Sequence, residues 1–395
     1  MNKLSAPRAQ HAVDPVELTA DLVRCQTVTP EEGSALKLLS ALLSEHGFQC
    51  QRIDRNGIPN LFAIWGEDRN GRTFGFNGHT DVVPIGDPKD WTVDPFGAEI
   101  RDGILYGRGS TDMKSGVAAF AAAAIEFVNE TPPDGRVIIA ITGAEETGSP
   151  DGTRAIVQWM EANDIRADHF IVGEPTSLKS IGDAIKIGRR GTITVFLTVT
   201  GVQGHSGYPE KANNPLPALV DLLQGFGQAA MDEGTEFFAP STLAITTIDT
   251  GNPARNVIPA TCKATLSIRF NDKWTSGKVL DWVSRHTRAA EDKFGVTISA
   301  DHYLSGECFF TPPGALAKLV QDAVEQETGQ RPQMTTLGGS SDARHLFKHC
   351  PVVEVGLTGE TLHQVDEHVS VAEINALKTV YGRILRDYFG SEGKI

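Results

Sequence analysis

Apolar residues recur along the chain at two spacings, one typical of helices and one of strands. From Val16 to Gly47 they recur at helical spacing with an interruption at residues 27–30, which predicts two helices. Strands that are buried on both faces read as short continuous apolar runs. The pattern therefore predicts strands at residues 60–65, 74–77, 136–142, 170–173 and 352–355, and helices at 116–129, 313–328 and 371–389. Strands and helices in alternation predict an α/β fold.

Titratable side chains follow these strands or precede the helices. Taken singly, each has an ordinary explanation: His79-x-Asp81 fits a polar turn, Asp112 fits a helix cap, and adjacent acids fit a solvated loop. In α/β sheets, however, the carboxyl ends of the strands share one edge, so these residues can converge. Two imidazoles with several carboxylates suit zinc or a similar divalent ion, and the excess of acids favours two ions. The residues are His79, Asp112, Glu145, Glu146, Glu174 and His363. The Pro-, Gly- and Asp-rich stretch at 83–107 is expected to form a loop around them.

Between Arg190 and His302 the pattern changes character. Residues 192–200 alternate apolar and polar as a half-exposed strand does. The predicted elements that follow are a helix at 215–228, strands at 243–248 and 261–270, a helix at 277–292 and a strand at 296–300. This βαββαβ order predicts an inserted ferredoxin-like domain. We therefore expect a discontinuous catalytic domain at 14–190 and 304–395, and an inserted domain at 191–303.

Composition narrows the classes of partner and the compartment. A formal net charge of -14 argues against nucleic acid or an anionic membrane as a partner. The five cysteines are widely spread and contain no Cys-x-x-Cys pair, which favours a reducing compartment and no thiolate metal site. No stretch reaches the length of a signal peptide core or a membrane span, so the cytoplasm is expected. Residues before Asp14 are expected to form a loose arm.

The motifs that surround the strand-end residues resemble a known family. The stretches are Gly78-His79-Thr80-Asp81, Arg108-Gly109-Ser110-Thr111-Asp112, Gly173-Glu174-Pro175-Thr176 and Gly338-Gly339-Ser340-Ser341-Asp342. They are similar to the co-catalytic zinc amidohydrolases, which include aminoacylases, carboxypeptidases and deacetylases. The resemblance spans nearly the whole chain. It implies a zinc-exopeptidase-like domain with a mixed central sheet flanked by helices, and an inserted domain that serves as lid and dimerisation surface.

The resemblance also implies roles for the strand-end residues. Asp112 would bridge two zinc ions, for which cobalt or another divalent ion can substitute. One ion would also bind His79 and Glu174, and the other Glu146 and His363. Asp81 would orient His79, Glu145 would be the general acid and base, and the Asp112–Met113 peptide bond would be cis.

The inserted domain would supply the remaining functional side chains. On sequence alone, His205 also fits a turn histidine, and each arginine also fits a solvated face. The resemblance implies that His205 reaches the reacting carbonyl from the lid or from the partner subunit of a homodimer. It implies substrate contacts from Arg189, Thr192, Tyr208, Asn256, Arg269, Gly339 and Ser340.

The substrate implied by the resemblance is a small N-acyl amino acid. Members that cleave N-succinyl-LL-2,6-diaminopimelate share the runs Gly188-Arg189-Arg190-Gly191 and Asn256-Val257-Ile258-Pro259. This sequence departs from the pattern of the succinyl-cleaving members at His205-Ser206-Gly207, at Ala144 and at Gly359. An N-acetylornithine-like substrate or a dipeptide therefore stays open, as does a non-catalytic binding role, although the complete ligand set disfavours that last alternative.

Overall fold

The computed structural model describes residues 12–29, 31, 33–67 and 71–390, and they fall into two compact units. The first unit comprises the described residues up to Ile187, Thr311–Thr335 and those from Ser341 onward; the second comprises Gly188–Phe310 and Thr336–Ser340. The expected insertion was 191–303, whereas the second unit also takes in residues 188–190, 304–310 and 336–340. Of the expected arm at residues 1–13, positions 1–11 lie outside the described residues.

A mixed sheet forms the centre of the first unit. Among the described residues it has eight strands, and the four in the middle, β6, β3, β7 and β18, run parallel. Their carboxyl ends therefore share one edge. The order is β1 (Gln49–Arg52), β2 (Asn60–Trp65), β6 (Gly135–Thr142), β3 (Arg72–His79), β7 (His169–Val172), β18 (Val352–Glu354), β8 (Ala184–Lys186) and β17 (Gln333–Thr335).

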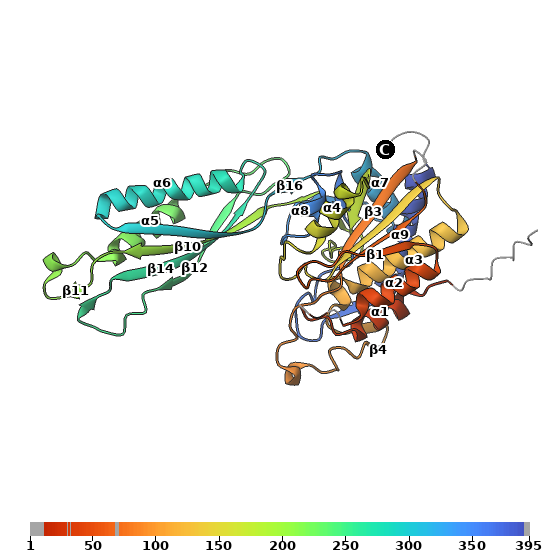
Figure 1. The fold of residues 1–395 in the computed structure, drawn as a ribbon, viewed down its shortest axis with the longest axis horizontal. Helices are drawn as coiled ribbons and strands as arrows, with labels where there is room; N and C mark the ends of the chain where they lie inside the picture. Colours follow the sequence, from red (N-terminus) through yellow and green to blue (C-terminus); the bar gives the residue numbers. More distant parts are fainter. Residues whose placement is uncertain (1–11, 30, 32, 68–70, 391–395) are drawn as a thin grey trace, which may run out of the picture. The chain divides into compact units, whose positions relative to one another are not determined.

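Helices cover both faces of this sheet. Phe76 on β3 stacks on Phe120 of α3, with ring centroids 4.2 Å apart, and also contacts Tyr381 of α9. The next residue, Asn77, donates to Thr153 of α4, and because successive strand residues point to opposite faces, α4 lies on the other side. Figure 1 shows α3 beside α9. The helices are α1 (Pro15–Arg24), α2 (Ala35–Glu45), α3 (Ser115–Glu130), α4 (Thr153–Ala162), α7 (Ala315–Thr328), α8 (Ala343–Leu346) and α9 (Val371–Gly390).

The stretch expected to be a loop at 83–107 contains regular structure. Its strands β4 (Glu99–Arg101) and β5 (Ile104–Tyr106) pair with β19 (His368–Ser370) in a small antiparallel sheet, and residues Pro88–Asp90 form a 3₁₀ turn. The loop prediction was therefore wrong for β4 and β5. Each has only three residues, and all three residues of β4 are exposed, so there was no alternating apolar pattern to detect. Pairing with a strand far along the chain holds them.

The second unit is a four-stranded antiparallel sheet with the order β12-β14-β10-β15. Helices α5 and α6 pack on one face, over buried residues that include Ile193, Val195 and Leu197. This is the βαββαβ order predicted from the sequence. The elements are β9 (Gly188–Arg189), β10 (Gly191–Thr200), β11 (Gly204–His205), a 3₁₀ turn (Pro209–Lys211), α5 (Pro215–Gln228), β12 (Thr242–Asp249), β13 (Val257–Ile258), β14 (Thr261–Phe270), α6 (Ser276–Phe294), β15 (Thr297–Gly306) and β16 (Phe309–Phe310).

Two further sequence expectations concern the cysteines and membrane-spanning segments. The five cysteines, all within the described residues, are free thiols. None of the helices in the described ranges is both long and apolar enough to span a membrane.

Candidate metal centre

His79 is the last residue of β3, and its ring is held from one side. Its Nδ1 lies 2.9 Å from the main-chain carbonyl oxygen of Asp81. Its Nε2 faces Asp112 Oδ1 at 3.1 Å and Glu174 Oε1 at 3.7 Å. An imidazole whose Nδ1–H is donated to a carbonyl presents Nε2 as the ligating nitrogen. The side chain is 1% exposed, so the ring has little freedom to turn away.

Asp112 lies between the two histidines of the site. Its Oδ1 faces His79, and its Oδ2 lies 3.1 Å from His363 Nε2. The residue is in a turn that runs from Gly109 into α3, and its peptide bond to Met113 is cis. A carboxylate that offers one oxygen to each side is suited to bridge two cations.

Glu146 and His363 form the other half of the cluster. Glu146 follows β6, and its Oε1 lies 3.0 Å from His363 Nε2. His363 has a positive φ of 62°, a conformation uncommon for a residue other than glycine. The loop around it, rather than a regular element, sets the direction of this imidazole.

These side chains make two groups that could each hold a metal ion. His79, Asp112 and Glu174 form one group and Asp112, Glu146 and His363 the other, with ligand atoms within 4.8 Å of one another in each. Each group offers one imidazole and two carboxylates, a donor set that divalent ions accept. Five of the six residues that the sequence analysis expected to converge thus lie in these two groups, and their role as metal ligands stays a prediction.

The carboxylates of the cluster raise the pKa values of its two histidines. Hydrogen bonds to Asp112 and Glu146 raise the pKa of His363 to about 10. Burial alone lowers the pKa of His79, but the hydrogen bond and charge of Asp112 outweigh it and raise that pKa well above its usual value. Burial raises the pKa of Asp112, yet its bonds to the two histidines bring it below its usual range. The carboxylates thus attract positive charge into the space that they line.

Asp81 lies beside His79, whose ring the sequence analysis expects it to orient. It contacts His79 most closely through its main-chain carbonyl, whereas its carboxylate lies 3.6 Å from Nδ1. That carboxylate accepts hydrogen bonds from the main-chain N–H groups of Glu145 and Glu146, both at 3.1 Å, and from the Thr29 hydroxyl at 2.9 Å. Its buried charge therefore fixes the turn that carries the glutamate pair.

Glu145 is half-buried beside the cluster. Burial raises its pKa well above the usual value, and the charges of Glu174 and Asp342 raise it further. A carboxylate with a raised pKa beside these two groups is suited to accept and release a proton. The geometry thus separates the two adjacent acids: Glu146 faces His363, and Glu145 does not belong to either group.

Sequence reasoning missed two buried charged residues next to the cluster. Arg108 and Glu367 form an ion pair at 2.7 Å. The Glu367 carboxylate also accepts hydrogen bonds from main-chain N–H groups, including that of Asp112. Arg108 belongs to one of the motifs that resemble the family, but Glu367 is a single acid in a polar loop. Only the pairing of β5 with β19 reveals its position.

The predicted substrate residues of the second unit fall into two groups. Arg189 donates to the carbonyl of Gly339 at 2.9 Å, and Arg269 donates to Thr192 Oγ1 at 2.6 Å, across neighbouring strands. Ser340 follows Gly339 in the same unit. These residues lie near the start of β10.

The other group lies past the end of β10. His205 on β11 pairs with Val257, and the carbonyl of the preceding residue, Asn256, accepts the main-chain N–H of Ser206 at 2.9 Å. The Tyr208 ring lies 5.6 Å from the His205 ring. Because β10 has ten residues, the two groups are separated by roughly 30 Å at about 3.3 Å per residue.

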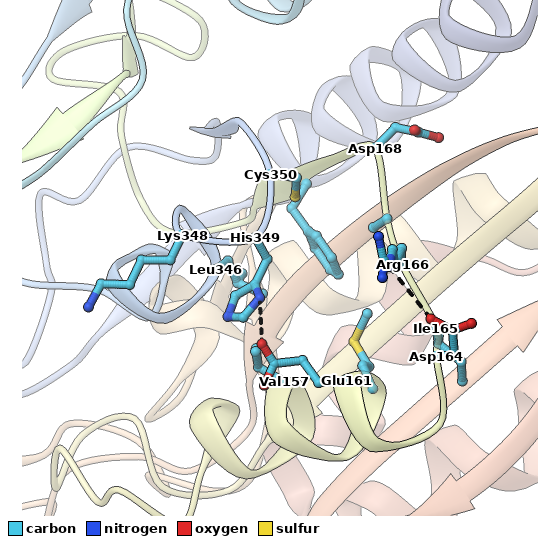
Figure 2. A pocket seen from close by; sticks show the side chains of 13 residues that line it. Val157, Glu161, Asp164, Ile165, Arg166, Asp168, Leu346, Lys348, His349 and Cys350 are labelled. Carbon is cyan, nitrogen blue, oxygen red and sulfur yellow. Dashed lines mark ion pairs between the residues drawn. The ribbon is translucent and has the colours of Figure 1, made fainter.

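A separate cavity of about 420 Å³ lies elsewhere in the first unit. Figure 2 shows that the cavity is lined in part by Glu161 and His349, which form an ion pair at 3.1 Å. The cavity reaches Asp168 and Phe170, at the amino end of β7, whereas Glu174 follows the carboxyl end. It contains none of the predicted site residues and lies at the end of the strand where α/β enzymes do not place their sites.

Comparison with known proteins places the chain in a family. Residues 75–387 match peptidase family M20/M25/M40. A relative from Cereibacter sphaeroides, named succinyl-diaminopimelate desuccinylase, is 58% identical over 95% of this chain and 99% of its own length. One from Ruegeria sp., named succinyl-diaminopimelate desuccinylase 1, is 57% identical with the same coverage of both chains.

Solved structures of lower identity share the fold. A metallo-carboxypeptidase of the M20 family from Sulfolobus solfataricus has a TM-score of 0.77 at 17% identity, covering 96% of this chain and all of that one. A Bacillus subtilis protein described as a dinuclear metal-binding peptidase from the M20 family has a TM-score of 0.74 at 13% identity, covering 96% and 98%. The chain belongs to peptidase family M20/M25/M40.

Proposed function

We propose that this protein is a dinuclear zinc amidohydrolase that cleaves N-succinyl-LL-2,6-diaminopimelate into succinate and LL-2,6-diaminopimelate, in the biosynthesis of diaminopimelate and lysine. The observation that carries the proposal is the convergence of two imidazoles and three carboxylates around a shared Asp112. The acyl group is supported by the names of the relatives at 57–58% identity. Zinc is supported by the nitrogen and oxygen donor set.

The proposed reaction is hydrolysis of an amide, which is slow because water is a weak nucleophile and the tetrahedral oxyanion is unstable. Two bound divalent ions supply Lewis acidity, which acidifies water and polarises a carbonyl. Glu145 takes the proton from the attacking water and delivers it to the leaving amine nitrogen. Its raised pKa suits both transfers, because the group must hold the proton between the two steps.

The substrate carries carboxylates at both ends, which require cationic and hydrogen-bonding partners. Arg189 and Arg269 offer guanidinium groups, which bind carboxylates with two parallel hydrogen bonds. Thr192, Gly339 and Ser340 lie in the same part of the second unit as these arginines. We assign the two arginine positions to the substrate carboxylates and the neighbouring polar groups to its orientation.

The separation of roughly 30 Å along β10 bears on the oligomeric state. One substrate of this size cannot contact both Arg269 and His205 of a single chain. We therefore assign His205, Tyr208 and Asn256 to the site of a second copy in a homodimer formed through the inserted domain. The open face of its sheet exposes Phe196 and Tyr303, which are 45% and 50% exposed, as an association surface. The free cysteines support a cytoplasmic location.

The substrate is tested by comparing rates on three compounds with zinc-loaded protein. These are N-succinyl-LL-2,6-diaminopimelate, N-acetylornithine and a dipeptide, with the Glu145→Gln variant as the control for contaminating hydrolases. We expect the succinyl compound to have the highest kcat/KM. Faster turnover of either competitor would overturn the assigned substrate, and no turnover of any by a metal-loaded dimer would support a binding role instead.

The contribution of His205 across the dimer is tested by mixing two inactive variants. In a mixed dimer of Glu145→Gln and His205→Ala subunits, one site receives both an intact Glu145 and an intact His205 from the other chain. Random exchange then restores about a quarter of the wild-type activity. If His205 serves its own chain, every site carries one of the two defects and no activity returns.

A further inference from the structure

Two ligand-bearing segments of the first unit meet at the strand pair β5 and β19. In their antiparallel register Tyr106 pairs with His368, and the N–H of Gly107 donates to the carbonyl of Glu367 at 2.8 Å. The turn that carries Asp112 leaves β5 at this point, and the loop that carries His363 enters β19 at the same point. Two of the three candidate ligands in the group Asp112, Glu146 and His363 therefore depend on contacts made beside this strand pair.

The Glu367 carboxylate uses both oxygens to hold the turn that leads to Asp112. Its Oε1 accepts the N–H groups of Thr111 at 2.9 Å and Asp112 at 3.1 Å. Its Oε2 accepts the N–H of Gly109 at 2.9 Å and the guanidinium of Arg108 at 2.7 Å. Gly109 has φ +82°, and a Cβ there would lie 2.5 Å from Val82 Cγ1. Main-chain N–H groups that follow a left-handed residue form a concave anion site, and the buried Glu367 carboxylate fills this one.

Arg108 connects the same carboxylate to the second ligand. Its guanidinium is 2% exposed and lies over the Trp91 ring at 5.2 Å. Besides Glu367 it reaches the main-chain carbonyl of His363 at 3.5 Å. His363 has a left-handed backbone, so contacts from outside its own loop are needed to hold its direction.

The other metal group is supported separately. His79 ends β3 and Glu174 follows β7, and these two strands pair in parallel up to Asn77 and Val172. The N–H of Gly173 continues this ladder by donating to the carbonyl of Asn77 at 3.2 Å. Main-chain bonds of the central sheet thus fix His79 and Glu174, whereas side-chain charges fix the spacing between Asp112 and His363.

We propose that Glu367 and Arg108 are a positioning pair that sets the distance between Asp112 and His363 and thereby the affinity for the ion of the group Asp112, Glu146 and His363. The inference rests on the proposed dinuclear centre and deepens it. It assigns unequal support to the two ions: the ion beside His79 keeps two ligands, His79 and Glu174, that the sheet fixes, whereas the ion beside His363 has two ligands, Asp112 and His363, that the buried ion pair positions.

The variant Glu367→Gln tests this pair without changing its size. An amide cannot accept on both sides, so an NH₂ group would face either the Arg108 and Gly109 donors or the N–H groups of Thr111 and Asp112. We expect the dissociation constant of the ion beside His363 to rise by about 10–100-fold, the range measured for residues that hold metal ligands. In zinc-buffered solution, calorimetry and elemental analysis should give two ions for the wild type and one for the variant.

Glu327→Gln is the matched control. Glu327 also forms an ion pair with an arginine, Arg383, at 2.9 Å, but it does so in the contact between α7 and α9. It should keep both ions. Arg108→Lys keeps the positive charge and loses the forked geometry, so it should weaken the same ion as Glu367→Gln. It also carries the test if Glu367→Gln does not fold, as judged by circular dichroism.

The metal measurement separates this inference from the proposed reaction. A wild-type protein that binds two ions but releases no succinate refutes the assigned substrate and leaves the positioning test intact. If folded Glu367→Gln and Arg108→Lys bind both ions with wild-type affinity, or lose the two ions equally, the assignment of Glu367 and Arg108 is wrong.

Discussion

Replacing Asp81 with asparagine tests which group its buried carboxylate holds. The side chain is fully buried and accepts three hydrogen bonds, from the N–H groups of Glu145 and Glu146 and from the Thr29 hydroxyl. Asparagine keeps the main-chain carbonyl that contacts His79. It replaces one acceptor oxygen with an NH₂ donor. That donor must then face either an N–H group of the glutamate turn or the Thr29 hydroxyl.

The magnitude follows from the bond that is lost. A hydrogen bond to a charged group contributes about 1.5–3 kcal/mol, so Asp81→Asn should lower the free energy of unfolding by about that amount. The released turn carries Glu145, and displacing a group that holds a catalytic residue costs about 10–100-fold in activity. Because the His79 contact is made by the main chain, affinity for the ion beside His79 should change little.

The assay combines urea unfolding, kcat/KM and zinc titration of the same variant. Thr29→Val is the graded control, since it removes one of the three donors and leaves the charge, and it should give a smaller loss in each measurement. An Asp81→Asn protein that loses the ion beside His79 while keeping its turnover on the remaining metal would show that the carboxylate orients His79, as first expected from the sequence.

The remaining predictions concern catalysis, protons and packing. Glu145→Gln should lower kcat by about 10²–10⁴-fold, the usual contribution of a general base, with both ions retained in elemental analysis; loss of metal would make Glu145 a ligand. The pKa of His363 is raised to about 10 without metal and that of His79 is also raised. Both rings must therefore lose a proton when ions bind, so apparent zinc affinity should rise with pH from 6 toward about 10. Calorimetry in buffers of different ionisation enthalpy measures the release, and no release at pH 7 would contradict the sign. Gly75→Ala places a Cβ 2.3 Å from the Phe170 ring and should cost about 1–3 kcal/mol in urea unfolding; wild-type stability would refute the packing.

Much of the fold followed from the apolar pattern. The strand β2, the helix α5 and the strand β14 have the predicted bounds, because each combines a continuous or alternating apolar pattern with a turn signal at its end. The convergence of His79, Glu146 and Glu174 could be predicted because they lie at or just beyond the carboxyl ends of parallel strands, which share one edge.

The contacts that orient those ligands could not be predicted. Two of the three partners of the Asp81 carboxylate are main-chain N–H groups, which almost every residue carries and no motif marks. Glu367 acts through the pairing of β5 with β19, two three-residue strands far apart in the sequence. The distance between Arg269 and His205 along β10 follows from the length of that strand, which motif spacing does not reveal.

Anomalous diffraction at the zinc edge, from crystals of the zinc-loaded protein, tests the central claim most directly. The account predicts two peaks with Asp112 between them. One should lie about 2.0–2.2 Å from His79 Nε2 and a Glu174 oxygen, and the other at the same distance from His363 Nε2 and a Glu146 oxygen. A single peak at full zinc loading, or a pair of peaks that Asp112 does not bridge, would contradict the dinuclear centre.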